Sequence, residues 1–264
     1  MARKYVITAS IADLRREPIQ FPVQDYSHQD LRETQLLFGE NIELLDQKEQ
    51  WLYISAIEQT YFDEQQGWLP HKGWILNSEA KEVEFFSSPK YAICVPCASI
   101  QNSLLSFGTL LSEVSSDTPD IRILPKIPNR TVLVEDSLLF LGIPYLWGGR
   151  AFDLRSPISS VDCSGLVNLL YRAQGVMLPR NAHDQYLKCR PTSDLKSGDP
   201  LYLAKEQRVS HVVLKLDEKT FIEAPKTGQS VRTLIWGKEM WEEKGRIHFF
   251  DRESSYIPYP GTFL

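Results

Sequence analysis

The pattern of apolar and polar positions differs between the two halves of the chain. In the first half, short apolar runs alternate with turn-forming residues at close intervals. The clearest are two strands expected at 41–45 and 51–57, separated by a polar turn. Closely spaced short strands are typical of a small β-barrel. We therefore predict one barrel over residues 1–75 and a second barrel, followed by a proline-containing linker, over 76–130.

The second half shows helical periodicity first and strand-like runs afterwards. Val134, Leu138 and Leu141 recur at helical spacing, and Gly142 follows as a helix stop. Another helix is expected to begin at Cys163, with an apolar face made of Leu166, Val167, Leu169, Leu170 and Ala173. Two strands follow in "HVVLKL" and "FIEAP", joined by a turn. This order predicts an α+β domain over residues 131–264.

Composition and charge exclude several classes of protein. The net charge of -5 gives no basic surface for nucleic acid or for an anionic membrane. No stretch approaches the ~18 consecutive apolar residues that span a bilayer, and the first residues lack an apolar run of signal length. The four cysteines make no disulfide framework, which is typical of a reducing compartment. We expect a cytoplasmic protein without a nucleic-acid or membrane partner.

Cys163 stands in "DCSGLV", where the second helix is expected to begin. A helix N-terminus lowers the pKa of a cysteine thiol, because its unpaired N–H groups point at the sulfur. Asp162 or Ser160 can cap this helix. A buried inert cysteine is the commoner fate of a lone cysteine, so this stretch alone leaves both interpretations open.

A thiol nucleophile needs a base, and the base needs an orienting group. His211 opens one of the expected strands, and Glu223 lies on the next strand, an even number of residues later. Their side chains share one face of the sheet if the connecting loop has an odd number of residues. Each residue alone is better explained as a solvated surface position. Only the ordered combination with Cys163 favours a catalytic triad.

Several motifs, taken in order, resemble the NlpC/P60 family of cysteine peptidases. They are "GIPYLWGG", "DCSGLV", "LPRNAHDQ", "LKSGDPLYL" and "SHVVLKL…FIEAP", within about residues 131–250. The upstream "ETQLLFGENIELLDQKEQWLYI" is similar to bacterial SH3-type domains. The resemblance implies a papain-like catalytic domain preceded by one or two SH3-like barrels. Without an export signal, this arrangement resembles γ-D-glutamyl-L-diamino-acid endopeptidases that recycle peptidoglycan peptides.

The resemblance implies a role for each matching residue. Cys163 is the implied nucleophile and His211 the general base, while Glu223 stands where the family usually has a third polar residue, commonly histidine. Contact with the substrate is implied for Tyr145 near the oxyanion, for Asp162 and Ser164 beside the nucleophile, and for Arg180, which is expected to hold a carboxylate. A surface salt bridge is equally compatible with this arginine. No cofactor and no metal site are implied.

The resulting hypothesis is a cysteine endopeptidase that hydrolyses the bond between γ-D-glutamate and a diamino acid, either diaminopimelate or lysine. Its expected partner is a peptidoglycan-derived peptide with a free N-terminal L-alanine, whose α-ammonium pairs with Asp162. The alternatives are another thiol amidase or acyltransferase of the same superfamily and a non-catalytic protein that binds cell-wall peptides. Cys94 and Cys97 form a C-x-x-C pair, but without a βαβ pattern or a second pair a redox or metal role is disfavoured.

Overall fold

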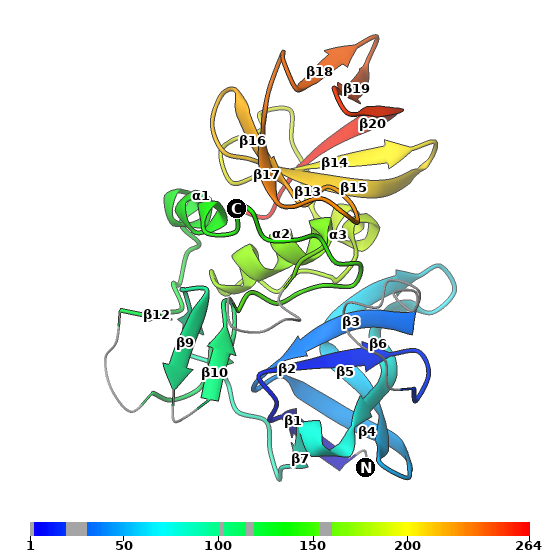
Figure 1. Cartoon of the computed structure of the whole chain (residues 1–264), viewed down its shortest axis with the longest axis vertical. Helices are drawn as coiled ribbons and strands as arrows, with labels where there is room; N and C mark the ends of the chain where they lie inside the picture. Colours follow the sequence, from blue (N-terminus) through cyan, green and yellow to red (C-terminus); the bar gives the residue numbers. More distant parts are fainter. Residues whose placement is uncertain (1–2, 20–30, 101–102, 115–118, 154–159) are drawn as a thin grey trace.

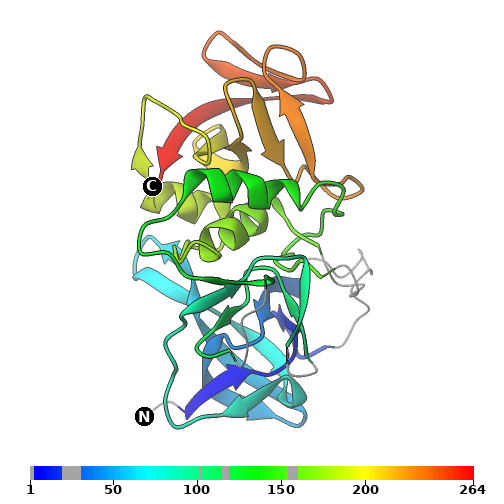
Figure 2. The ribbon, with the colours of Figure 1, turned by 90° about the vertical axis from the view of Figure 1, so that its left-hand side faces the viewer.

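The computed structural model describes residues 3–19, 31–100, 103–114, 119–153 and 160–264. Three helices lie between a large C-terminal sheet and the strand-rich N-terminal part of the chain, as Figures 1 and 2 show from two sides. In the described part of the chain, no helix is both long enough and apolar enough to cross a bilayer.

The N-terminal part is an antiparallel sheet of seven described strands in the order β3-β2-β6-β5-β4-β1-β7. Its strands are β1 (Arg3–Ile7), β2 (Ile11–Arg15), β3 (Arg32–Leu37), β4 (Asn41–Lys48), β5 (Trp51–Asp63), β6 (Gly67–Leu76) and β7 (Ala80–Glu82). The two predicted strands are confirmed as β4 and β5, and both are longer than predicted. A 3₁₀ turn at Asn77–Glu79 returns the chain so that β7 pairs with β1. The sheet therefore continues beyond the predicted boundary at residue 75.

Alternation along the strands of this sheet explains its core. In the first half of β4, Ile42 and Leu44 are buried while Asn41 and Glu43 are partly accessible, as a two-residue period requires. The buried side chains gather in a core of their own, which includes Ile42, Leu44, Leu52, Ile54 and Ile75. The SH3-like identity of this unit stays a prediction.

The next region pairs as two smaller antiparallel sheets. One has the order β11-β8-β12 and the other joins β9 to β10. These strands are β8 (Tyr91–Ile93), β9 (Cys97–Ile100), β10 (Ser103–Ser106), β11 (Leu110–Leu111) and β12 (Ile121–Ile123). They enclose a small apolar cluster that includes Ile93, Ala98 and Leu105. A second SH3-like barrel in this region stays a prediction.

The C-terminal part begins with helices and continues as an antiparallel sheet, as the α+β prediction required. The helices are α1 (Arg130–Leu138), α2 (Cys163–Arg172) and α3 (Ala182–Lys188). The sheet runs β17-β16-β15-β14-β20-β19-β18, with β13 paired to β20. Its strands are β13 (Arg190–Pro191), β14 (Pro200–Lys205), β15 (Arg208–Lys215), β16 (Thr220–Glu223), β17 (Arg232–Ile235), β18 (Met240–Glu243), β19 (Arg246–Phe249) and β20 (Arg252–Thr262). Leu141 lies beyond the end of α1, so the first predicted helix is shorter than its apolar pattern suggested.

Helix α2 occupies the centre of the molecule. It begins at Cys163, as predicted, with Asp162 as its N-cap, and the left-handed Gly175 (φ 75°) follows its last turn. The apolar face of α2 is buried in the largest core cluster. Ile11 from the N-terminal sheet and Phe107 from the middle region belong to the same cluster. The N-terminal, middle and C-terminal parts therefore share one hydrophobic core.

A buried group of charges also joins the N-terminal sheet to the C-terminal part of the chain. The carboxylate of Glu40 is 1% exposed and accepts hydrogen bonds from Arg150 and from Gln59. Arg172 of α2 lies 3.7 Å from Glu40 and makes a closer pair, at 2.7 Å, with Glu58. Burial alone would raise the pKa of Glu40, but the two arginines lower it, so the carboxylate stays ionised.

Candidate active site

Cys163 lies in a cavity of about 570 Å³ formed where α2, α3 and β15 meet the N-terminal sheet. The predicted residues that line this cavity are Tyr145, Asp162, Cys163, Ser164 and His211. Two residues of the N-terminal sheet region, Arg16 and Glu33, line it as well. The structure therefore brings the two halves of the chain together around one concave site.

The predicted pairing of His211 with Glu223 is present. Strands β15 and β16 pair Lys215 with Phe221, which leaves an odd number of residues, 216–220, between these partners. Both side chains consequently lie on one face, and Nε2 of His211 is 2.7 Å from Oε2 of Glu223. The backbone N–H of Val212, the next residue along β15, points at the sulfur of Cys163. The nitrogen Nδ1 of His211 is thus the one available to exchange a proton with the thiol.

Glu223 is completely buried and is held by two arginines that sequence reasoning missed. Its Oε1 accepts from Nη2 of Arg232 at 2.8 Å, and its Oε2 accepts from Nη2 of Arg252 at 2.6 Å. Burial opposes ionisation of Glu223, but the hydrogen bond and charge of His211 and the charge of Arg252 lower its pKa to about 2. The carboxylate is therefore a permanent anion that fixes the orientation of the His211 ring.

Asp162 has no acceptor capacity left for a substrate. Its Oδ1 accepts from the N–H of Gly165, from the hydroxyl of Ser164 and from Arg180, at 2.6, 3.0 and 3.0 Å. Its Oδ2 accepts from the N–H of Gly148 at 3.1 Å and from Arg180 at 2.7 Å. Five donors exceed the roughly four lone-pair sites of a carboxylate. The expected pairing of Asp162 with a substrate ammonium is therefore at odds with this geometry, and its role is to cap α2.

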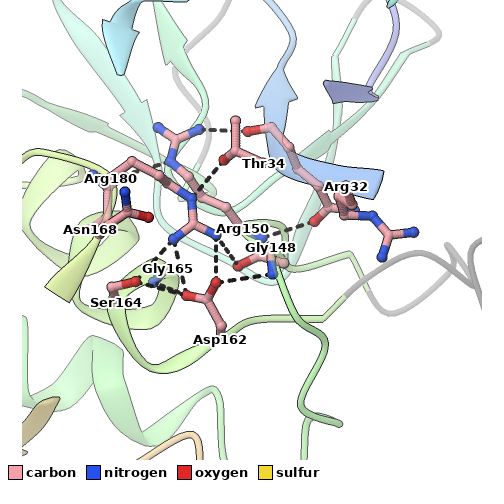
Figure 3. A network of polar contacts seen from close by, with 12 residues as sticks. Arg32, Thr34, Gly148, Arg150, Asp162, Ser164, Gly165, Asn168 and Arg180 are labelled. Atoms are coloured by element: carbon pink, nitrogen blue, oxygen red, sulfur yellow. Dashed lines mark hydrogen bonds and ion pairs between the residues drawn. The ribbon is translucent and has the colours of Figure 1, made fainter. Parts of the chain in front are cut away.

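Arg180 does hold a carboxylate, but that carboxylate belongs to Asp162 and not to a substrate. The guanidinium is 1% exposed and does not line the cavity. Figure 3 shows it reaching from Asp162 to Thr34 of the N-terminal sheet, whose hydroxyl accepts from Nε at 2.6 Å. Its Nη2 also donates to the carbonyl of Gly149. The predicted substrate contact of Arg180 is corrected to a link between the N-terminal sheet and the start of α2.

The thiol of Cys163 differs from the expectation for a helix N-terminus. Burial, and secondly the charge of Asp162, raise its pKa to about 12. The N–H groups of Val212 and Ser164 and the charge of Arg180 oppose this rise without overcoming it. The thiol of Cys163 is consequently neutral, so it would need a base to act as a nucleophile.

Tyr145 is placed as the sequence implied. It lines the cavity while only 7% of its surface is exposed. Burial raises the pKa of its phenol, and the nearby Cys163 and Asp162 add to this rise. The hydroxyl is therefore a neutral hydrogen-bond donor at every pH relevant to catalysis.

Glu33 is a carboxylate of the cavity that the sequence analysis did not identify. Its Oε1 is 2.8 Å from Nδ1 of His71, and its Oε2 accepts from Nε of Arg16 at 2.7 Å. The hydrogen bond of His71 lowers the pKa of Glu33 to about 2 against the opposing effect of burial. Glu33 is thus ionised, and its two hydrogen bonds leave it acceptor capacity that Asp162 lacks.

The low pKa of Glu33 predicts an acid-dependent loss of stability. The pKa of Glu33 is about 2 in the folded protein and about 4.3 in the unfolded chain. Its ionised form therefore stabilises the fold fully at pH values above about 4.3. This contribution is lost as the pH falls toward 2. We expect Glu33→Gln to lower the free energy of unfolding by up to about 3 kcal/mol at pH 6 and to have little effect at pH 2. Urea titrations at both pH values measure this, and an equal deficit at the two values would exclude the linkage.

The remaining cysteines show no catalytic arrangement. Cys94 and Cys97 form no disulfide, and the thiol of Cys94 lies 3.4 Å from the carbonyl oxygen of Asp120. Burial raises the pKa of Cys94, as it does for Cys163, but Cys94 does not line the cavity that contains His211. Within the described ranges, no cluster of three or more His, Cys, Asp or Glu side chains is suited to a metal ion.

Comparison with known proteins shows which family and which fold this chain resembles. Residues 142–248 match the NlpC/P60 family. The chain is 26% identical over 241 residues to the γ-D-glutamyl-L-lysine dipeptidyl-peptidase of Bacillus subtilis (strain 168), covering 80% of this chain and 78% of that protein. It is 25% identical over 238 residues to the protein of the same name in Bacillus cereus, covering 76% and 70%. A crystal structure of an NlpC/P60 family protein from Bacillus cereus shares the fold, with a TM-score of 0.76 and 19% identity over 97% of this chain and 98% of that one.

Proposed function

Because this chain carries an NlpC/P60 domain and is homologous to γ-D-glutamyl-L-lysine dipeptidyl-peptidases, we propose that it cleaves the bond between γ-D-glutamate and a diamino acid in peptidoglycan-derived peptides. The observation that carries this proposal is that Cys163 and His211 line one cavity while the buried Glu223 holds His211 from behind it. A nucleophile, a base and an orienting anion in this arrangement constitute the machinery of a cysteine peptidase.

The geometry supports a two-step acyl transfer. Cys163 attacks the γ-carbonyl carbon while its proton passes to Nδ1 of His211. The Tyr145 hydroxyl and the backbone N–H of Cys163 stabilise the oxyanion. His211 then gives its proton to the leaving amine and, in the second step, activates the water that hydrolyses the thioester. Glu223 stabilises the imidazolium form of His211 in both steps.

We further propose that the substrate needs a free N-terminus, which Glu33 recognises. The N-terminal sheet region brings Arg16 and Glu33 to the cavity. Glu33 is ionised and has acceptor capacity left, so an α-ammonium group of the substrate can pair with it. This assigns to Glu33 the role that the sequence hypothesis gave to Asp162.

A defined tripeptide tests the reaction and the role of Glu33 together. We expect the protein to release the diamino acid from L-Ala-γ-D-Glu-diaminopimelate and to leave the N-acetylated peptide almost intact. Glu33→Gln is expected to raise the KM of the free peptide about tenfold or more, with a smaller effect on kcat. Mass spectrometry identifies the cleaved bond, so release of ammonia or of L-alanine would instead indicate another thiol amidase. An unchanged KM in Glu33→Gln would remove Glu33 from the proposal.

A further inference from the structure

Two cations at the cavity are not used by the proposed mechanism. Lys205 and Arg208 close the hairpin between β14 and β15, where they form a pair across the two strands. Both are exposed and both line the cavity. In contrast to Arg16, which pairs with Glu33, neither forms an ion pair with any residue that the structure describes. Glu206, at the hairpin tip between them, is not among the residues that line the cavity.

The position of these cations relative to His211 assigns them to one end of the substrate. His211 donates a proton to the leaving amine, so the residue that leaves must lie against β15. Arg208 precedes His211 by three residues on this strand, and a bulge between them keeps both on the same face. Their backbones are therefore at most about 10 Å apart. The side chain of a diamino acid and that of an arginine together span this distance. A group at the end of the leaving side chain therefore comes within reach of Arg208.

His183 completes the surroundings of Arg208. It lines the same cavity from α3, and burial, together with the charge of Arg208, lowers its pKa. Asp184 and Glu64 act in the opposite direction on this histidine. His183 is consequently a neutral hydrogen-bonding group, which leaves Arg208 and Lys205 as the cations that line this end of the cavity.

On the basis of the proposed function, we propose that Arg208, assisted by Lys205, binds a carboxylate on the side chain of the leaving residue. The enzyme then selects diaminopimelate, whose side chain ends in both a carboxylate and an ammonium, over lysine, whose side chain ends in an ammonium alone. A guanidinium binds a carboxylate through two parallel hydrogen bonds and repels an ammonium group. The hairpin of β14 and β15 is thus a specificity-determining element of the site.

Two tripeptides that differ only in the third residue test this proposal. With L-Ala-γ-D-Glu-diaminopimelate and L-Ala-γ-D-Glu-L-lysine, we expect kcat/KM of the wild-type protein to favour diaminopimelate about tenfold or more. Arg208→Gln should lower kcat/KM for diaminopimelate about tenfold and leave that for lysine unchanged or higher. Lys219→Gln, which removes an exposed cation of the same sheet away from the cavity, should change neither value.

The outcomes separate this inference from the proposed function. Equal rates on the two peptides, a preference for lysine, or an equal effect of Arg208→Gln on both would overturn the carboxylate subsite while leaving the peptidase activity established. If the wild-type protein cleaves neither peptide, the proposed function itself is wrong, and the subsite is rejected with it.

Discussion

Replacement of Cys163 by alanine is expected to abolish hydrolysis of the tripeptide, with a loss in kcat on the order of 10⁴-fold or more. In the proposed mechanism, the sulfur of Cys163 is the atom that bonds to the carbonyl carbon. No other described cysteine lines the cavity. Since Cys163 is the first residue of α2 and its capping bonds come from Asp162, alanine should leave the fold intact. Rates measured by mass spectrometry and thermal unfolding of the same samples report the two properties separately.

Cys189→Ala provides the matched control for this experiment. Cys189 is also partly buried in the catalytic half, but it lies beside Gly261 and does not line the cavity. Its removal should cost some stability and leave kcat within about twofold of the wild-type value. Wild-type turnover by Cys163→Ala would show that another group attacks the substrate.

Arg180→Met is expected to cause the largest loss of stability, about 3–5 kcal/mol, which is the cost of leaving a buried charge without its partner. The guanidinium is the cation that pairs with Asp162, at 2.7 Å. It also lowers the pKa of Cys163, so its loss should make the thiol harder to deprotonate and lower kcat/KM throughout the range from pH 6 to 10 without shifting the profile. Urea unfolding measures the first effect, and rates between pH 6 and 10 measure the second.

A second substitution separates the lost charge from lost packing. In the Arg180→Met background, Asp162→Asn removes the unpaired anion and should restore part of the stability, although each change alone is destabilising. Thr34→Val removes the hydroxyl that accepts from Arg180 and donates to Gln59, and should cost about 1–3 kcal/mol. The structure indicates that the two residues are coupled. If Asp162→Asn lowers the stability of Arg180→Met by as much as it lowers that of the wild-type protein, this coupling is absent.

The features that sequence predicted well are those set by local pattern. The start of α2 follows from a capping residue ahead of an apolar face, and the pairing of His211 with Glu223 follows from strand alternation around a short turn. The motif "DCSGLV" placed the proposed nucleophile at a helix start for the same reason, because its residues are consecutive in the chain.

The features that sequence did not predict depend on contacts between distant segments. Arg232 contacts Glu223 because β17 pairs with β16. Arg252 lies on β20, which follows β17 in the chain only after β18 and β19. Glu33 reaches the cavity through the packing of the N-terminal sheet on the catalytic half, for which no local signal exists. The pKa of Cys163 was misjudged because burial outweighs the helix N-terminus, and burial is a property of the assembled fold.

The buried charges around Glu40 have a consequence for the modularity of this chain. Arg150 and Arg172 belong to the catalytic half, whereas the carboxylates that neutralise them, Glu40 and Glu58, come from the N-terminal sheet. A catalytic half excised at residue 131 would expose part of its core and leave these guanidiniums without partners. Such a fragment is a poor candidate for domain shuffling, because the recipient would have to supply matching anions at both positions. The N-terminal sheet is therefore a structural part of the enzyme, because it neutralises buried charges of the catalytic half.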